Sequence, residues 1–295
     1  MILVVVGPTG VGKTKMSVEL AKHYDAEIIN ADSMQVYKYL NIGTAKVTEE
    51  EKENIPHHLF DICEVNDIYT VYDYQKDARA KIKELQDKNK NIIIVGGTGL
   101  YIRALLFDYN FKDEDTDNLN LYEDLTNQEI LNKILEYDED CDIHVNNRKR
   151  LVRYLNKLEQ DLVLDNNGSK SLYDFYMIGL TTDRDTLYEK INNRVDKMVE
   201  EGLIDEVKYF YDNNIRSKAI STGIGYKELY RAFDKEISMD EAIDLIKKNS
   251  RRYAKRQYTF FNNQFPNIHW YNTDYTNFSK TVNEVIKDID KNLIK

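Results

Sequence analysis

The stretch "VVVGPTGVGKTK", residues 4–15, decides the fold that this sequence predicts. It matches the phosphate-loop pattern GxxxxGK[ST], directly after an apolar run typical of a strand and directly before the helical "MSVELAKHY". Glycines let backbone N–H groups curl around phosphate oxygens, and the N-terminus of the following helix adds positive potential. A lysine then neutralises phosphate charge, and the threonine hydroxyl can ligate Mg²⁺. The predicted phosphate-binding residues are Gly7, Pro8, Thr9, Gly10, Val11, Gly12, Lys13 and Thr14.

The rest of the chain predicts an α/β fold, a P-loop NTPase-like and mostly parallel sheet flanked by helices. The runs "ILVVV", "AEIINAD", "NIIIVGG" and "FYMIGL" are short, apolar and separated by helical patterns. After the last run, Thr182 or Asp183 is expected to cap a helix that Gly202 ends. Residues 110–172 contain no such run and predict a helical insertion. We therefore expect a catalytic core of residues 1–109 and 173–295 around it.

Composition and charge narrow the class of protein. Two cysteines in no metal-binding spacing and no apolar run near the roughly 20 residues of a membrane span predict a soluble, cytoplasmic chain, which we expect to be a monomer. The net charge of −10 is uneven, because residues 113–142 alone carry −11. Two basic stretches, "HVNNRKRLVRYLNK" and "KKNSRRYAKR", stand outside that acidic segment. A nucleic-acid partner is therefore not excluded.

Two further strand ends should face the phosphate loop. In open α/β sheets ligands bind at the carboxyl ends of strands, which places Asp32 of "NADSMQVY" and Thr98 of "VGGTGLY" beside the loop. From the residues alone, Asp32 is a candidate Mg²⁺ ligand, helix cap or general base. The glycines around Thr98 allow a close backbone approach, or simply a tight turn. Nothing in the phosphate loop itself tells whether ATP or another pyrophosphate binds there.

Seven segments give the chain a resemblance to a known family over nearly its whole length. "GPTGVGKT", "ADSMQVYKYLNIGTAK", "PHHLFDI", "VGGTGLYIRALL", "RVDKMVEEGLIDEV", "GIGYKE" and "AKRQYTFF" occur in the order and rough spacing of the tRNA dimethylallyltransferase family. The resemblance implies transfer of a dimethylallyl group from dimethylallyl diphosphate to the N6 amine of the adenosine on the 3′ side of the anticodon. It also implies Mg²⁺ as cofactor and the tRNA anticodon stem-loop as partner.

The resemblance also implies roles for individual residues. Asp32 resembles the general base, and Thr98 resembles the residue that positions the attacking nitrogen. Arg194 is our candidate for stabilising the leaving diphosphate, with a plain surface arginine as the alternative, and Arg103 is a candidate for supporting the diphosphate site. The implied tRNA-binding residues are Asp32, Ser33, Met34, Gln35, Thr98, Lys149, Arg150, Leu151, Val152, Arg153, Thr222, Gly223, Ile224, Gly225, Tyr226, Lys227, Arg251, Lys255 and Arg256.

The sequence also departs from the family pattern and is compatible with competing functions. Val145 stands where the family usually has proline, Phe260 where tryptophan is usual, and Asn262 where arginine is usual. A small-molecule kinase would use the same loop with Asp32 activating a hydroxyl. A prenyltransferase acting on a free nucleotide would share the chemistry, and a non-catalytic RNA-binding adaptor would share the basic stretches. A solvated helix face is the simpler interpretation of each basic stretch taken alone.

Overall fold

The computed structural model describes residues 1–109, 122–139, 141, 143–159 and 170–293. The chain forms two compact units, one of Met1–Leu106 with Leu172–Lys295 and one of Phe107–Ser171. An isolated antiparallel bridge between Phe107 and Ser171 joins the two ends of the second unit. The sequence predicts an insertion of residues 110–172 at this place. The predicted acidic cluster lies partly outside the described residues, which exclude the acids at positions 113–117, 140 and 142.

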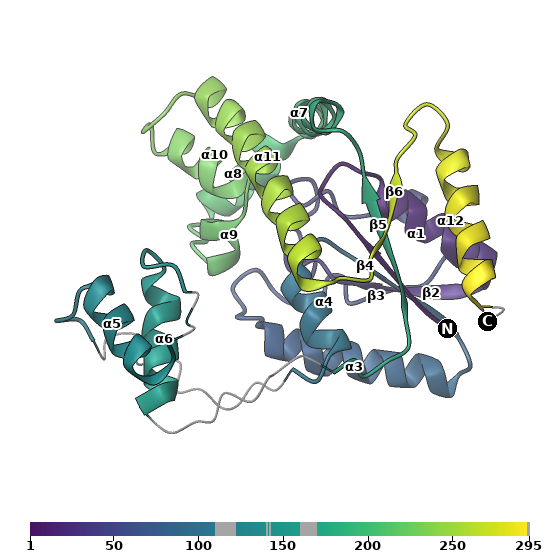
Figure 1. Ribbon diagram of the computed structural model, residues 1–295. Helices are drawn as coiled ribbons and strands as arrows, with labels where there is room; N and C mark the ends of the chain where they lie inside the picture. The colour runs from purple at the N-terminus through teal and green to yellow at the C-terminus, as the bar shows by residue number, and fades with distance from the viewer. Residues whose placement is uncertain (110–121, 140, 142, 160–169, 294–295) are drawn as a thin grey trace. The chain divides into compact units, whose positions relative to one another are not determined.

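The larger unit is built on a six-stranded sheet (Figure 1). The strand order is β3-β2-β4-β1-β5-β6, and each neighbouring pair is parallel. Val4 in the central strand pairs with Ile94 on one side and with Met177 on the other. The predicted α/β class with a parallel sheet is therefore confirmed. The strands are β1 (Ile2–Val6), β2 (Ala26–Asn30), β3 (His57–His58), β4 (Asn91–Val95), β5 (Tyr176–Thr181) and β6 (His269–Asn272).

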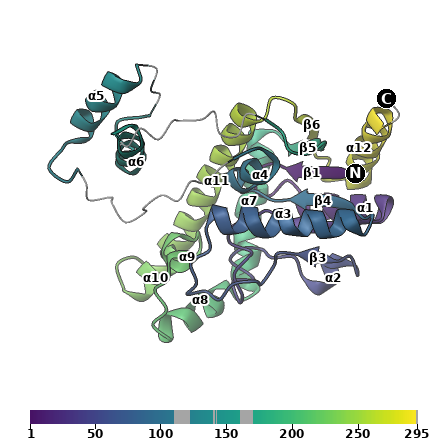
Figure 2. The same cartoon turned by 90° about the horizontal axis from the view of Figure 1, so that it is seen from below.

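Helices cover both faces of this sheet. The connections β1 to β2 and β2 to β4 run in opposite directions across it, so right-handed crossovers place α1 (Lys13–Tyr24) and α3 (Val71–Asp87) on opposite faces. The C-terminal α12 (Phe278–Leu293) packs beside α1, and α4 (Gly99–Leu106) packs beside α3 (Figures 1 and 2). A short α2 (Glu49–Lys52) precedes β3. Both layers bury the apolar faces of the strands.

A helical lobe follows β5. The expected cap is Asp183, whose side chain accepts a hydrogen bond from the Thr186 amide at the start of α7 (Arg184–Glu200). Gly202, at φ 103°, then separates α7 from α8 (Leu203–Asp212). A hydrophobic cluster that includes Leu40, Leu203 and Tyr226 packs this lobe against the loop after β2. The remaining helices of the lobe are α9 (Lys218–Thr222), α10 (Tyr226–Phe233) and α11 (Met239–Gln264).

The smaller unit contains two described helices, α5 (Asn127–Tyr137) and α6 (Arg148–Glu159). Thr126 and Glu129 form a reciprocal capping box at the start of α5. The two helices share a small core to which Ile130, Ile134, Leu151, Val152 and Leu155 belong. This unit therefore has an apolar core of its own.

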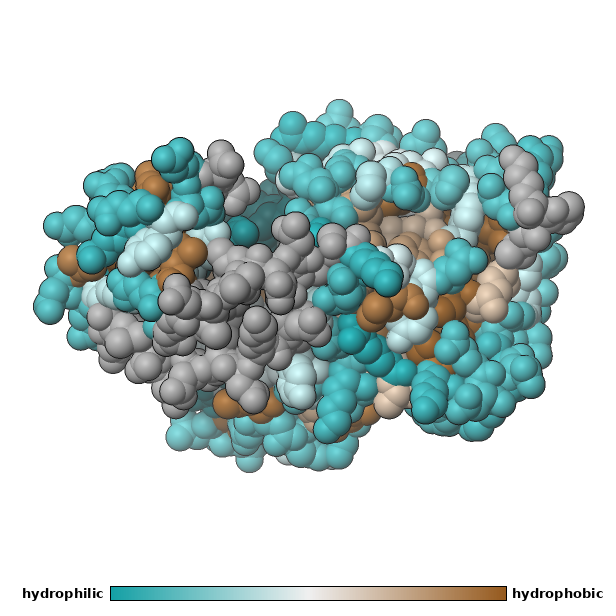
Figure 3. Space-filling view, turned by 60° about the horizontal axis from the view of Figure 1, so that its bottom comes forward, coloured by the Kyte–Doolittle hydropathy of each residue, from teal (hydrophilic) through white to brown (hydrophobic). Residues whose placement is uncertain are grey.

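The face that Figure 3 shows is largely hydrophilic, with apolar patches among the hydrophilic residues. That distribution agrees with the 31% charged residues of the sequence. Among the helices of the described residues, none is long and apolar enough to cross a membrane.

Because the side chains of β1 are buried, we expect that truncating one of them lowers the stability of the protein strongly. We expect Leu3→Ala, at a fully buried position, to lower the free energy of unfolding by about 2–5 kcal/mol, because transfer energy and packing are both lost. Ile68→Ala is the matched control, since this side chain is 76% exposed and its truncation should cost less than about 0.5 kcal/mol. Urea unfolding followed by the fluorescence of Trp270 in β6 measures both, and equal effects would contradict the assignment.

Candidate active site

The carboxyl ends of β1, β2 and β4 open onto a cavity of about 740 Å³. Its walls come from the phosphate loop, the loop after β2, the turn after β4, α7, the segment 222–227 and α11. All of these elements belong to the larger unit. The site therefore lies where the order of a parallel sheet places ligands.

The phosphate loop has the geometry that its pattern predicts. Gly7, Gly10 and Gly12 have φ values of 140°, 90° and 88°, a backbone region that side chains disfavour. A Cβ on Gly7 would also lie 2.4 Å from the Leu180 carbonyl oxygen. No side chain caps the N-terminus of α1, so its first N–H groups remain directed at the cavity. These groups form a ready anion-binding site.

Two cations face each other across this loop. Lys13 Nζ donates a hydrogen bond to the Pro8 carbonyl oxygen at 2.8 Å, and Arg194 Nη1 donates to Thr9 Oγ1 at 3.2 Å. Burial and, to a smaller extent, the charge of Arg194 lower the pKa of Lys13 to about 7, while Asp32 opposes the shift. Burial also lowers the pKa of Arg194. Two desolvated cations beside unpaired amides suit an anionic ligand with two phosphate groups.

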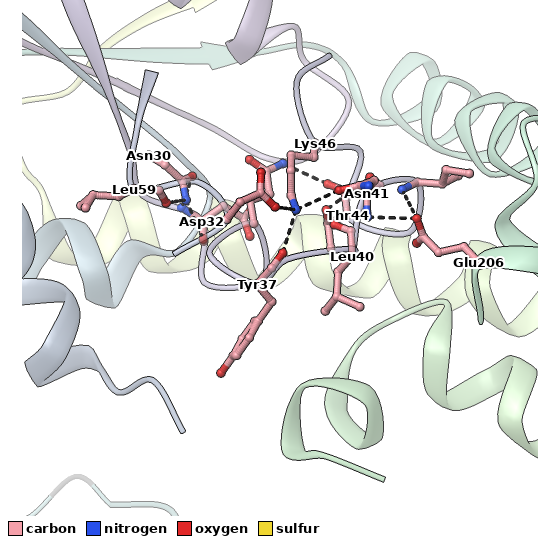
Figure 4. A network of polar contacts seen from close by, with 12 residues as sticks. Asn30, Asp32, Tyr37, Leu40, Asn41, Thr44, Lys46, Leu59 and Glu206 are labelled. Carbon is pink, nitrogen blue, oxygen red and sulfur yellow. Dashed lines mark hydrogen bonds and ion pairs between the residues drawn. The ribbon is translucent and has the colours of Figure 1, made fainter. Parts of the chain in front are cut away.

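Asp32 lies at the end of β2 on the cavity wall. Its Oδ1 accepts a hydrogen bond from the Met34 amide at 2.9 Å, and its own amide donates to Asn30 Oδ1 at 2.9 Å. The buried Asn30 also donates to the carbonyl oxygens of Asp32 and Leu59, which fixes the strand end (Figure 4). No helix begins at Asp32, so its role as a helix cap is excluded. The carboxylate caps a local turn and remains a candidate base.

Thr98 connects the second strand end to the first. Its Oγ1 accepts a hydrogen bond from the Ser33 amide at 3.0 Å and donates to Ser33 Oγ at 3.2 Å. Ser33, Met34 and Gln35 line the cavity, while Thr98 lies directly behind Ser33. The structure thus brings both predicted strand ends together.

Two residues of α11 complete the site and were not singled out from the sequence. Gln257 is buried, its Oε1 accepts from the Thr9 amide at 2.9 Å, and its Nε2 donates to the Gly97 carbonyl at 3.0 Å. Tyr253, one turn earlier, lines the cavity and hydrogen-bonds Thr98 and Gln257. Burial raises the pKa of its phenol. The only signal was the motif "AKRQ", whose glutamine had no assigned role.

The predicted tRNA contacts separate into three groups. The whole stretch Thr222–Lys227 lines the cavity, and so does Arg256. Lys255 is exposed on α11, whereas Arg251 donates from Nη1 to Asn192 Oδ1 at 2.5 Å and is held against α7. Gln35 is used inside its own loop, since its Nε2 donates to the carbonyl oxygens of Thr44 and Ala45.

In the smaller unit, only part of the predicted basic run is available to a partner. Lys149, Arg150 and Arg153 are exposed on α6. Leu151 and Val152 are buried in the core of the unit, because a helix turns successive residues to different faces. Their side chains therefore stabilise the unit and do not face its surface.

Of the predicted diphosphate-binding residues, Gly7, Pro8 and Val11 belong to the phosphate loop without lining the cavity, and Arg103 lies away from it. Arg103 lies on α4, where its guanidinium contacts the side chain and the carbonyl oxygen of Gln264. The position of Arg103 around the axis of α4 points its side chain toward Gln264, the last residue of α11. Arg103 is absent from the described residues that line the cavity.

Within the part of the chain that the structure describes, a metal site made of protein ligands alone is not seen. Among the described residues, no group of three or more His, Cys, Asp or Glu side chains could hold an ion. Thr14, in the first turn of α1 beside Lys13, offers an exposed hydroxyl on the cavity. This donor set fits Mg²⁺, which is usually bound by few protein oxygens together with phosphates and water.

The fold and the site define a phosphate-loop α/β protein whose cavity suits a diphosphate beside an acidic strand end. A family model described as IPP transferase matches residues 35–264. The "tRNA dimethylallyltransferase" of Anoxybacillus flavithermus is 44% identical over 299 residues, which cover 98% of this chain and 96% of the relative. That of Bacillus subtilis is 44% identical and covers 92% and 90%. The chain belongs to the IPP transferase family, and the family predicted from the sequence is confirmed.

Solved structures agree with this assignment. The tRNA delta(2)-isopentenylpyrophosphate transferase of Staphylococcus epidermidis is 39% identical with a TM-score of 0.75, and 99% of each chain is covered. A eukaryotic dimethylallyltransferase described as acting on tRNA is 25% identical with a TM-score of 0.84, covering 99% of this chain and 79% of that one. The predicted enzyme class, a prenyltransferase, is likewise confirmed.

The low pKa of Lys13 predicts that anion binding is coupled to proton uptake. Lys13 is mostly neutral at pH 8 in the free protein, and a bound diphosphate raises its pKa, so binding takes up a proton and weakens as the pH rises above 7. Calorimetry with inorganic pyrophosphate in buffers of different ionisation enthalpy measures this uptake.

The control for this measurement is Lys13→Arg, whose side chain is always protonated. The variant should show only the proton exchange of pyrophosphate itself. Equal proton uptake by the variant and the native protein at pH 8 would mean that Lys13 does not titrate there.

Proposed function

We propose that this protein transfers a dimethylallyl group from dimethylallyl diphosphate to the N6 amine of the adenosine on the 3′ side of the anticodon in tRNA, releasing diphosphate. The observation that carries the proposal is one cavity lined by Lys13, Asp32 and Arg194, in a chain related over nearly its full length to tRNA dimethylallyltransferases. Every group that the reaction uses in this cavity comes from one chain, which suits a monomer.

The donor's diphosphate would lie on the phosphate loop. The N–H groups at the start of α1, Lys13 and Arg194 bind its oxygens and stabilise the negative charge that develops when the allylic C–O bond breaks. Mg²⁺, held by the Thr14 hydroxyl and phosphate oxygens, would supply additional positive charge at the leaving group. Because the cations are already desolvated and positioned, little reorganisation is needed as the bond breaks.

The acceptor amine would lie beside Asp32. The N6 lone pair forms the new N–C bond, the electron pair of the allylic C–O bond leaves with diphosphate, and the proton from N6 passes to the Asp32 carboxylate. Ser33, held by the Thr98 hydroxyl, fixes the backbone next to this carboxylate. The adenine must first leave the stacked anticodon loop, at a cost of a few kcal/mol.

Contacts with the rest of the tRNA would offset that cost. The stretch Thr222–Lys227 and Arg256 lie on the cavity, where an extruded base and its neighbouring phosphates would enter. Lys255 on α11 and the exposed cations of α6 are available for phosphate contacts. Binding dominated by such contacts weakens steeply with salt.

A reconstituted assay tests the function. The protein is incubated with unmodified tRNA, Mg²⁺ and either dimethylallyl diphosphate or ATP, and nucleosides are analysed by mass spectrometry. We expect isopentenyladenosine only with the prenyl donor, and a decrease of about 10²- to 10⁴-fold in Asp32→Asn, because general base catalysis is lost. Asp87→Asn, at the exposed end of α3, controls for the charge change. Consumption of ATP with unmodified tRNA would establish the kinase alternative instead.

The basic face of α6 gives a separate prediction for tRNA affinity. We expect Arg150→Ala to weaken tRNA binding and to reduce the salt slope by about one, as the loss of one phosphate contact does. Lys133→Ala removes an equally exposed charge from α5 of the same unit and should leave the slope unchanged. Fluorescence anisotropy titrations with tRNA from 50 to 200 mM salt measure both, and identical slopes would assign α6 to solvated surface.

A further inference from the structure

Glu206 has an unusual set of partners for a residue that does not line the cavity. It lies in the first turn of α8, and its Oε2 accepts hydrogen bonds from the amides of Asn41 at 3.0 Å and Ile42 at 2.8 Å. Its Oε1 accepts from the Gly43 amide at 3.0 Å and from the Tyr226 hydroxyl at 2.6 Å. Figure 4 shows the carboxylate beside the loop that carries Asn41. One carboxylate thus binds four donors.

The four donors belong to two walls of the cavity. Residues 41–46, which we call the wall loop, line it on one side, and Tyr226 lines it on another. A Cβ on Gly43 would lie only 2.6 Å from the Tyr226 ring, so the glycine lets the two walls meet. Glu206 holds them together at that contact.

The wall loop is also fixed from the side of the sheet. Lys46 Nζ donates to the Tyr37 carbonyl at 2.7 Å and to Asp61 Oδ1 at 2.6 Å, as Figure 4 shows in part. Gln35 binds the carbonyl oxygens of Thr44 and Ala45. The amides of Ala45 and Lys46 also donate to the carbonyl oxygens of Ile42 and Asn41 at 2.9 Å, so the wall loop is a compact turn. Glu206 binds residues 41–43 of this turn to the helical lobe, and the position of the turn relative to Tyr226 therefore depends on the α8 carboxylate.

The cavity is apolar where this contact is made. Lining residues that also pack into the hydrophobic cluster around Tyr226 are Met34, Ile42, Val195, Met198, Leu203, Ile224 and Ile246. Met198 lies four residues after Arg194 on α7, and side chains at that spacing are about 5–6 Å apart on a helix. A diphosphate held at Arg194 would therefore direct an attached group of roughly five carbons toward this apolar end.

We propose that Glu206 is a positioning residue that clamps the wall loop against Tyr226 and thereby limits the apolar end of the cavity to a five-carbon prenyl group. This inference rests on the proposed function, because it assigns the apolar end to the donor's hydrocarbon. Each carboxylate oxygen accepts from two donors, so an amide in its place would direct an NH₂ group at two of the four donors. The wall loop would then move away from Tyr226, and the apolar end would widen.

The test compares two donors and measures the wall loop directly. Glu206→Gln should raise KM for dimethylallyl diphosphate about tenfold with kcat nearly unchanged, and should lower about tenfold the preference for it over geranyl diphosphate. Hydrogen exchange of the amides of residues 41–43 should become faster. Tyr226→Phe, which loses one of the four bonds, should change the preference in the same direction but less. Asp205→Asn makes the same charge change in the same turn of α8 and should leave all three readouts unchanged.

Three outcomes would overturn the proposal, and they differ in what else they overturn. Native donor preference in Glu206→Gln, with a fully active native protein, refutes the clamp alone. A fall in kcat that matches the fraction of unfolded protein, with KM and preference unchanged, assigns Glu206 to stability. Failure of the native protein to use either donor overturns the proposed function together with the donor preference.

Discussion

The parallel pairing of β4 with β1 on one side and with β2 on the other is the constraint on which the site depends. It ends three neighbouring strands at one edge, so that the phosphate loop, Asp32 and the turn before Thr98 meet although 90 residues separate the first from the last. An antiparallel neighbour would send one of these ends to the opposite edge. The residues of the cavity lie close together because the strands that precede them run in the same direction.

The electrostatics of the cavity follow from that convergence. Lys13 and Arg194 are brought together at a buried place where burial disfavours both charges, and the charge of Arg194 also disfavours that of Lys13. Asp32 favours both charges, and Glu51 and Glu201 also favour that of Arg194. The folded protein tolerates this arrangement because the parallel core is extensively buried. The negative charge of a bound polyphosphate stabilises both cations, so the electrostatic cost of placing them side by side is offset when the ligand binds.

Local patterns predicted much of this structure, and distant contacts were the part they missed. The phosphate loop, the strand ends and the Thr222–Lys227 stretch are each specified by a few adjacent residues, so their pattern is visible in the sequence. Gln257 and Glu206 were not predicted to matter, because a single glutamine or glutamate carries no pattern. Thr9 is 248 residues from Gln257, and the loop amides that bind Glu206 are more than 160 residues from it. Leu151 and Arg103 show a different limit, since helix phase, and not membership of a motif, decides which way a side chain points.

The two ends of the smaller unit lie next to each other in the backbone. Phe107 bridges to Ser171, and the Leu172 amide donates to the Leu106 carbonyl oxygen at 2.8 Å. The chain therefore leaves and re-enters the larger unit at two neighbouring points of the backbone. An insertion joined in this way can change in length or sequence without disturbing the sheet, because its two ends stay at the same place in the backbone.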